Sequence, residues 1–135
     1  MPPLNQPFGL AAAAMVFLTV ARNEDYRSEL ALWADTIAKR PANALARVMY
    51  GQALDRAGRH ADAVKHYEAA VKIFPRFAMA HDNLGQDLAR QGRLDEAIAH
   101  YETAVALNPS FADAHNNLAA ALVQEAVGEG VAAVA

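Results

Sequence analysis

The histidines and carboxylates are the residues of this chain best suited to chemistry. Histidine ligates metal ions and carries protons near neutral pH, and the chain has five of them. Two histidine pairs, however, share a spacing of 34 residues, so a duplicated segment accounts for them: His66 with His100, and His81 with His115. We interpret the main carboxylates as solvent-facing partners in local ion pairs: Asp62, Glu68, Asp95, Glu96 and Glu102.

The sequence contains no other catalytic machinery. Cysteine is absent, which excludes thiolate metal sites, disulfides and cysteine nucleophiles. No nucleophile motif, phosphate-binding loop or zinc motif occurs. We therefore predict no catalytic residue, no metal, no cofactor and no enzymatic activity. The formal net charge is −3, and basic residues alternate with acidic ones, so no basic surface typical of nucleic-acid binding is expected.

The interval of 34 residues extends over whole segments of the chain. Residues 44–77 and 78–111 align without a gap, and 16 of the 34 aligned positions are identical. Self-similarity at this interval predicts paired helices that stack on their neighbours. The elements that position any functional side chain are therefore helical hairpins.

The repeated residues suit defined places in a pair of antiparallel helices. Small residues allow two helices to approach closely, and tyrosines fill the space beside them. Glycine ends the first helix of a pair in the left-handed conformation, and proline stops the second. The residues are Gly51, Ala63, Tyr67 and Pro75 in one copy and Gly85, Ala97, Tyr101 and Pro109 in the next, with Gly58 and Gly92 at the helix ends.

In identity and spacing, these residues resemble the tetratricopeptide-repeat (TPR) family. The resemblance implies an all-α, right-handed superhelical solenoid of antiparallel helix pairs, called A and B. Weaker copies extend the pattern in both directions and give about seven helices, at residues 8–21, 25–39, 44–56, 60–73, 78–90, 94–107 and 112–126. We expect an apolar N-terminal helix within residues 1–23, a solenoid over 24–127 and a flexible or packed tail over 128–135.

In TPR proteins the A helices line a concave groove, so the resemblance implies a peptide-binding surface on the exposed faces of these helices. Carried over to this chain, the groove comprises Met49, Gln52, Asp82, Asn83, Gln86, Arg90, Asp113, Asn116 and Asn117, with Val48 beside them. Asn83 and Asn117 are one repeat apart, and a primary amide can both donate to and accept from an extended peptide. The groove lacks the cations that would hold a carboxylate, so we expect no binding of chaperone C-terminal tails.

Residues 8–21 are almost wholly apolar and carry no charge. A bilayer span needs about 20 apolar residues, whereas this stretch has 14. Two interpretations remain: the first A helix of the solenoid, or the remnant of a membrane helix. A signal peptide is disfavoured because a basic segment is lacking before the apolar one.

Residues 19–46 are similar to the junction between the last membrane helix and the TPR tail of bacterial membrane proteins resembling protein O-mannosyltransferases. The similarity lies in the group Tyr26-Arg27-Ser28-Glu29, in Leu32-Trp33 and in Pro41. It implies a tail outside the cytoplasm that assists a glycosyltransferase. We therefore place a membrane-associated or extracytoplasmic location ahead of a cytoplasmic one.

Three functions follow from these patterns. The first is a non-catalytic scaffold that binds a protein or peptide in the groove. The second is the tail of a membrane glycosyltransferase-like protein. The third is head-to-tail self-assembly, because both ends of the solenoid expose apolar residues that would otherwise need a cap: Phe8, Val16 and Phe17 at one end, and Leu118, Leu122 and Val123 at the other.

Overall fold

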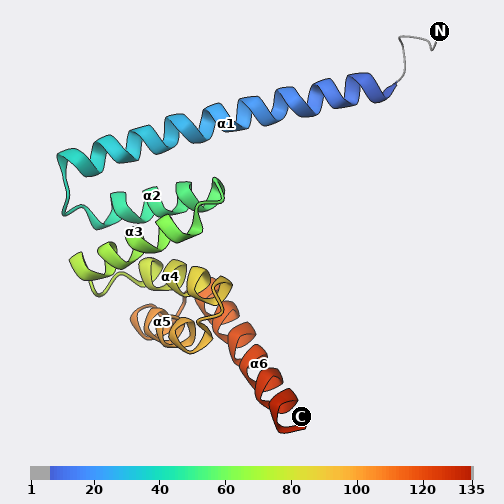
Figure 1. Cartoon of the computed structure of the whole chain (residues 1–135). Helices are drawn as coiled ribbons and strands as arrows, with labels where there is room; N and C mark the ends of the chain where they lie inside the picture. Colours follow the sequence, from blue (N-terminus) through green and yellow to red (C-terminus); the bar gives the residue numbers. More distant parts are fainter. Residues whose placement is uncertain (1–6, 135) are drawn as a thin grey trace.

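Six helices stack in chain order along one axis (Figure 1). The computed structural model describes residues 7–134, with side chains described from residue 11 onward. The helices are α1 (Pro7–Lys39), α2 (Ala44–Arg56), α3 (His60–Ile73), α4 (Ala78–Arg90), α5 (Leu94–Leu107) and α6 (Ala112–Val134). No strand occurs among the described residues, so the expected all-α class is confirmed.

The helices form antiparallel hairpins whose crossings depend on glycine. A Cβ atom added to Gly51 would lie 2.4 Å from Tyr67 Cε1, and one added to Gly85 would lie 2.6 Å from Tyr101 Cε1. Both distances are far below van der Waals contact, so only glycine lets α2 approach α3 and α4 approach α5. Ala63 and Ala97 are fully buried on the facing helices. The predicted close packing is thereby confirmed.

The turn within each hairpin is set by a glycine with positive φ. Gly58 and Gly92 both have φ of 78°, a conformation that side chains with a Cβ rarely adopt. The next residue then donates its N–H back to the helix, from Arg59 N to Leu54 O at 2.8 Å and from Arg93 N to Leu88 O at 2.9 Å. These bonds satisfy carbonyls that the helix end leaves free.

A second repeated contact fixes the entry to each A helix. His81 Nε2 lies 2.8 Å from the carbonyl oxygen of Pro75, and His115 Nε2 lies 2.7 Å from that of Pro109. Arg47 stands at the same repeat position and donates its Nε–H to Pro41 O at 3.2 Å. Two of the five histidines thus make the same structural contact in successive repeats. The sequence indicated their duplication but not this contact.

The hydrophobic core runs continuously through the hairpins. Its largest fully buried apolar side chains are Tyr67, Leu54, Leu88 and Val48. Leu30 of α1 and Leu118 of α6 pack against the core from the two ends of the stack. The expected groove position of Val48 is corrected here, because this side chain faces the core.

The expected helices 8–21 and 25–39 are one continuous helix, α1. The connecting residues Arg22, Asn23 and Glu24 include neither glycine nor proline, so the chain has no residue that stops a helix there. The first half of α1 therefore extends past the hairpins and does not fold back as an A helix (Figure 1). The second half packs on α2, joined by an ion pair between Glu29 and Arg56.

We define the N-terminal arm as residues 11–20 of α1, all of which are exposed. Val16 and Phe17 are 64% and 73% exposed, while the side chain of Phe8 lies outside the described residues. Over the described part of the chain, no helix combines the length and hydropathy that crossing a bilayer requires.

Helix α6 continues to Val134, beyond the expected end at residue 126. Gly128 and Gly130 each cost a helix about 1 kcal/mol relative to alanine, and the surrounding alanines and valines keep the segment helical. Leu122 and Val123 are exposed on α6, and Leu118 is partly buried. The expected domain boundaries at residues 23 and 128 thus fall inside helices.

Candidate functional site

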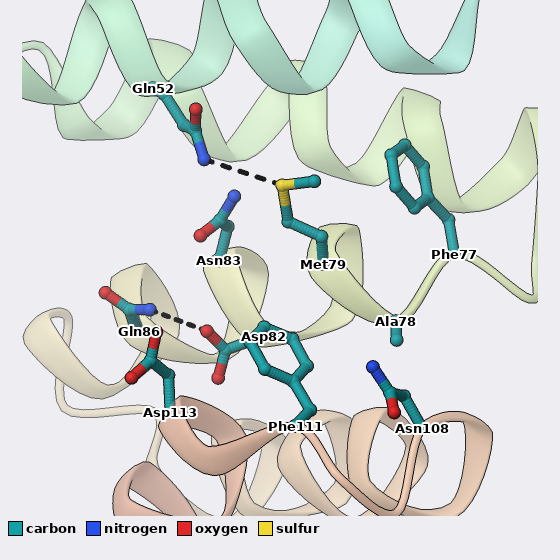
Figure 2. A pocket seen from close by; sticks show the side chains of 10 residues that line it. All are labelled: Gln52, Phe77, Ala78, Met79, Asp82, Asn83, Gln86, Asn108, Phe111 and Asp113. Carbon is teal, nitrogen blue, oxygen red and sulfur yellow. Dashed lines mark hydrogen bonds between the residues drawn. The ribbon is translucent and has the colours of Figure 1, made fainter.

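The first helices of successive hairpins line a hollow on one face of the stack. It has a volume of about 500 Å³ and receives side chains from α2, α4, α6 and the turns that precede α4 and α6 (Figure 2). Helices α2, α4 and α6 contact one another in sequence along this face. The lining residues are Gln52, Phe77, Ala78, Met79, Asp82, Asn83, Gln86, Asn108, Phe111 and Asp113.

One wall of the hollow is apolar and aromatic. Phe77 and Phe111 occupy the same repeat position, directly before α4 and α6, and Met79 is the second residue of α4. All three are only partly buried, so their rings and thioether remain available to contact a guest. A flexible thioether between two aromatic rings adapts to guests of different shapes.

Asp82 is the buried polar centre of the other wall. Only 2% of this residue is exposed. Gln86 Nε2 donates to its Oδ2 at 2.8 Å and Asn117 Nδ2 donates to its Oδ1 at 2.9 Å. Both donors are neutral amides, so they orient the carboxylate without supplying a positive charge. Asn117 thereby ties α6 to α4.

Asn83 offers an unused hydrogen-bond donor in the hollow. Its Nδ2 atom is buried and has no hydrogen-bond partner within the described part of the chain. In Figure 2 the amide is directed toward Gln52 and Met79. The only contact between those two is a weak one of 3.8 Å from Gln52 Nε2 to the Met79 sulfur. Buried donors normally find an acceptor, so this site is poised to receive one.

The structure brings together part of the groove that the sequence predicted. Gln52, Asp82, Asn83, Gln86 and Asp113 line the hollow, and Asn117 supports it through Asp82. The remaining predicted residues, Met49, Asn116 and Arg90, are not among the lining residues. Sequence reasoning missed Phe77, Ala78, Met79, Asn108 and Phe111. The recurrence of phenylalanine at positions 77 and 111, one repeat apart, is the signal that could have identified these two residues.

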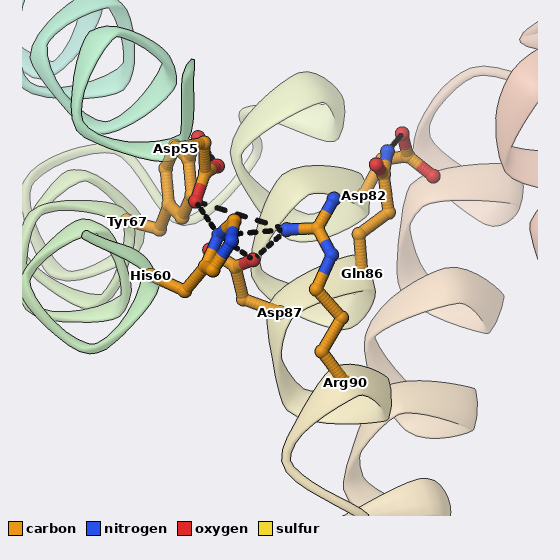
Figure 3. A network of polar contacts seen from close by, with 7 residues as sticks. All are labelled: Asp55, His60, Tyr67, Asp82, Gln86, Asp87 and Arg90. Carbon is orange, nitrogen blue, oxygen red and sulfur yellow. Dashed lines mark hydrogen bonds and ion pairs between the residues drawn. The ribbon is translucent and has the colours of Figure 1, made fainter. Parts of the chain in front are cut away.

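Arg90 belongs instead to a polar cluster between the two central hairpins (Figure 3). We define the junction cluster as Asp55, His60, Tyr67, Asp87 and Arg90. Arg90 Nη1 contacts Asp87 Oδ1 and lies 3.2 Å from His60 Nδ1 and 3.8 Å from Asp55 Oδ1. His60 Nδ1 is 2.9 Å from Asp55 Oδ1, and Tyr67 donates its hydroxyl to Asp55 Oδ2 at 2.6 Å.

The electrostatics of the junction cluster depend on burial. Burial, reinforced by the neighbouring Asp55, raises the pKa of Asp87 to about 7, although Arg90 and His60 oppose the shift. Burial and the hydrogen bond to Asp55 raise the pKa of Tyr67 well above its usual value. Tyr67 therefore acts as a permanent donor.

Asp55, His60 and Asp87 place one ligand atom each within 4.8 Å of one another. Such a set can ligate a divalent cation, and sequence reasoning did not single it out. The guanidinium of Arg90 already contacts all three residues, however, and supplies the positive charge. The cluster is therefore an internally neutralised junction between hairpins.

A histidine pair connects α4 to α5 within the second hairpin. His81 Nδ1 and His100 Nδ1 are 3.0 Å apart. Because His81 Nε2 must donate to the carbonyl of Pro75, its Nδ1 accepts the proton of His100 Nδ1–H. Burial, followed by repulsion from His81, lowers the pKa of His100. The pair therefore joins α4 to α5 through a hydrogen bond between two rings.

A stack of antiparallel hairpins with a hollow along its first helices defines a helical-repeat solenoid protein. Two sequence profiles identify the repeat: one described as tetratricopeptide repeat matches residues 17–76, and one described as TPR repeat matches residues 85–125. The chain is thus built of tetratricopeptide repeats.

Solved structures share this fold. The TPR domain of Sgt2 from Aspergillus fumigatus superposes with a TM-score of 0.74 at 18% identity, covering 92% of this chain and 83% of that one. The first TPR domain of human RPAP3 gives a TM-score of 0.74 at 20% identity, covering 83% and 88%. The first TPR domain of Spaghetti (RPAP3), bound to the HSP90 peptide SRMEEVD, gives 0.73 at 20% identity, covering 80% and 86%.

A curated relative is an O-mannosyl-transferase by name. Protein O-mannosyl-transferase Tmtc2 of Drosophila melanogaster is 35% identical over 74 residues, which are 55% of this chain and 8% of that protein. The chain therefore spans a small part of that relative's length. This match agrees with the similarity of residues 19–46 to the TPR tails of O-mannosyltransferase-like proteins.

Proposed function

We propose that the chain is a non-catalytic scaffold that binds an extended segment of a partner protein in the hollow between α2, α4 and α6. The observation that carries this proposal is the unpartnered, buried Nδ2 of Asn83, which faces a hollow with an aromatic wall. A hollow of about 500 Å³ falls within the range of roughly 300–1,000 Å³ that is usual for binding pockets.

An extended peptide matches the chemistry of this surface. Its backbone presents carbonyl oxygens, one of which can accept from Asn83 Nδ2, while Gln52 can both donate and accept. Its apolar side chains fit between Phe77, Met79 and Phe111. The first TPR domain of Spaghetti is bound to an HSP90 peptide, and the second TPR domain of human RPAP3 is in complex with an HSP70 peptide. These complexes support peptide capture as the mode of binding.

The test is peptide selection against the full chain, followed by titration calorimetry with the strongest selected peptide. The double variant Asn83→Ala with Phe111→Ala removes the free donor and one aromatic wall. We expect it to weaken binding by about 100-fold, since each lost contact contributes on the order of 1–2 kcal/mol. Circular dichroism confirms that the variant is folded.

Asn116→Ala is the matched control, because this asparagine lies on α6 and is exposed outside the hollow. We expect the control to bind as tightly as the unaltered chain. Equal binding by the double variant, or failure to select any peptide, would rule the proposal out.

A second candidate function is self-assembly through the ends of the stack. Residues 15–18 are four consecutive exposed apolar residues, so the N-terminal arm is apolar around its whole circumference, and such helices are normally covered. At the other end, Val127, Val131 and Val134 of α6 are exposed as well. We propose that the arm of one copy packs on α6 of the next.

Light scattering on the full chain tests this second candidate. We expect species larger than a monomer, and we expect Val16→Glu with Phe17→Glu to restore the monomer. Leu32→Glu adds a charge at an exposed leucine of α1 outside the arm and serves as the control. A strict monomer that instead binds lipid vesicles through the arm contradicts self-assembly and favours the tail of a membrane protein.

A further inference from the structure

The hollow carries negative charge and no positive charge. Asp82 and Asp113 are the only charged residues among those that line it, and the others are amides, aromatic or aliphatic residues. Figure 2 shows both carboxylates on the same side of the hollow, one from α4 and one from the first turn of α6. A guest in this space therefore meets two carboxylates.

The charge of Asp82 is not neutralised within the described part of the chain. The residue is 2% exposed, and its two oxygens accept only from the neutral amides of Gln86 and Asn117. Arg90, the basic residue of the same helix, is directed to Asp87 and the junction cluster instead. A buried carboxylate without a cation is costly, and a positively charged guest would remove that cost.

Neither carboxylate is needed for stacking the repeats. The position of Asp82 is held by Val48 in the preceding repeat and by Asn116 in the following one. Val48 is fully buried, so an apolar residue satisfies the packing there. Asp113 stands where the earlier repeats have Leu45 and Met79. The repeat therefore does not require an acid at either position, although Asp82 also accepts from Asn117 and so joins α4 to α6.

We propose that the groove recognises a partner segment through a lysine or arginine side chain, which enters the hollow and pairs with Asp82 and Asp113. This proposal rests on the proposed function. The amides hold the Asp82 carboxylate in place before the guest arrives, so little order is lost on binding. Arginine suits the site better than lysine, because its planar fork donates to both carboxylates at once.

The same arrangement rejects acidic segments. The solved TPR domain of Spaghetti holds the peptide SRMEEVD, whose acidic end would face two carboxylates in this hollow. Like charges in a partly buried site repel by several kcal/mol. The fold is shared with that domain, but the charge preference of the groove is inverted.

Fluorescence anisotropy with a selected peptide and its charge variants tests the proposal. We expect the selected peptides to share a basic residue, and replacement of that residue by alanine to weaken binding by about tenfold. Asp113→Asn should weaken binding of the basic peptide by a similar factor but leave the alanine peptide unchanged. SRMEEVD should not bind the unaltered chain, and Asp113→Lys should favour acidic peptides over basic ones.

Asp95→Asn removes an exposed carboxylate of α5 outside the hollow and should leave every affinity unchanged. One outcome overturns the charge proposal and leaves the peptide groove standing. In this outcome, Asn83→Ala with Phe111→Ala weakens binding, but neither removal of the basic residue from the peptide nor Asp113→Asn changes the affinity. Peptides that ignore the groove variants altogether overturn both.

Discussion

Two buried aspartates on the same helix have opposite surroundings. Asp82 and Asp87 both lie on α4, and both are almost fully buried. Asp87 faces the junction cluster, where Arg90 supplies positive charge from within the chain. Asp82 faces the hollow, where only two neutral amides hold it.

The difference separates a structural role from a binding role. A buried charge that meets its partner inside the fold joins two hairpins, whereas a buried charge without one leaves a place for a partner from outside. Asp87 occupies the repeat position of Ala53, and Asp82 that of Val48. Apolar residues can therefore fill both positions, and each aspartate needs its own explanation.

The largest effect is expected from a change that disrupts both regions at once. Gly85 lies between Asp82 and Asp87 and touches Tyr101 closely enough that no Cβ fits. Gly85→Val should therefore push α4 away from α5 and lower the free energy of unfolding by about 3 kcal/mol, as measured by urea denaturation. Gly128→Val is the control, since a Cβ there meets nothing within 4 Å. Equal stability of the two variants would falsify the role assigned to Gly85.

The junction cluster alone is broken by removing its cation. Arg90→Met leaves Asp55 and Asp87 without the guanidinium, and we expect the free energy of unfolding at pH 8 to fall by about 2 kcal/mol. This figure is below the 3–5 kcal/mol typical of fully buried pairs, because Arg90 is 49% exposed. Arg93→Met removes an exposed ion pair with Glu96 and should leave the free energy of unfolding almost unchanged. The interpretation is wrong if the two variants are equally stable.

The junction cluster should also make stability depend on pH. The pKa of Asp87 is about 7, raised from its usual 3.8 mainly by burial. The folded state therefore binds a proton more tightly than the unfolded state. The resulting stability is fully present below about pH 4 and is lost as the pH rises through 7.

Between pH 5 and pH 8 we expect the free energy of unfolding to fall by about 2.5 kcal/mol, and Asp87→Asn to remove most of this fall. Urea denaturation across the pH range measures both. Asn116→Ala, which removes no titratable group and lies on an exposed part of α6, is the comparison variant and should keep the slope of the unaltered chain. An unchanged slope in Asp87→Asn would show that another group titrates.

The sequence predicted the parts of the fold that repeat and missed the parts that do not. Gly51, Tyr67 and their copies recur at a fixed interval, and their packing was confirmed. The ends of the stack depend on residues outside that pattern. The missing glycine near residue 22 lets α1 continue, and two glycines in α6 are too weak to end it.

The candidate site divides in the same way. The A-helix register identified Asp82 and Asn83, because groove positions follow from helix geometry. It could not show that Arg90 contacts His60 and Asp55 of the preceding hairpin, since side-chain pairing across hairpins has no repeat signal. Nor could it show that the carboxylate of Asp82 has no cationic partner among the described residues. Both facts require the arrangement in space.

The smallest effect sharpens the comparison most, because it comes from the removal of a single charge. Asp82→Asn keeps the shape of the side chain and removes the charge. Gln86 and Asn117 can each rotate their amide to accept or donate as required, so both hydrogen bonds persist. Without the uncompensated carboxylate, we expect the free energy of unfolding at pH 8 to rise by about 0.5–1 kcal/mol.

The corresponding change at the other aspartate should have the opposite effect. Asp87→Ala leaves Arg90 without its partner and leaves a gap in the core, so it should lower the free energy of unfolding. Urea denaturation of both variants at pH 8 measures whether the two changes in the free energy of unfolding have opposite signs. If Asp82→Asn is clearly less stable than the unaltered chain, then the carboxylate is part of the fold, and a positively charged guest is not needed to explain it.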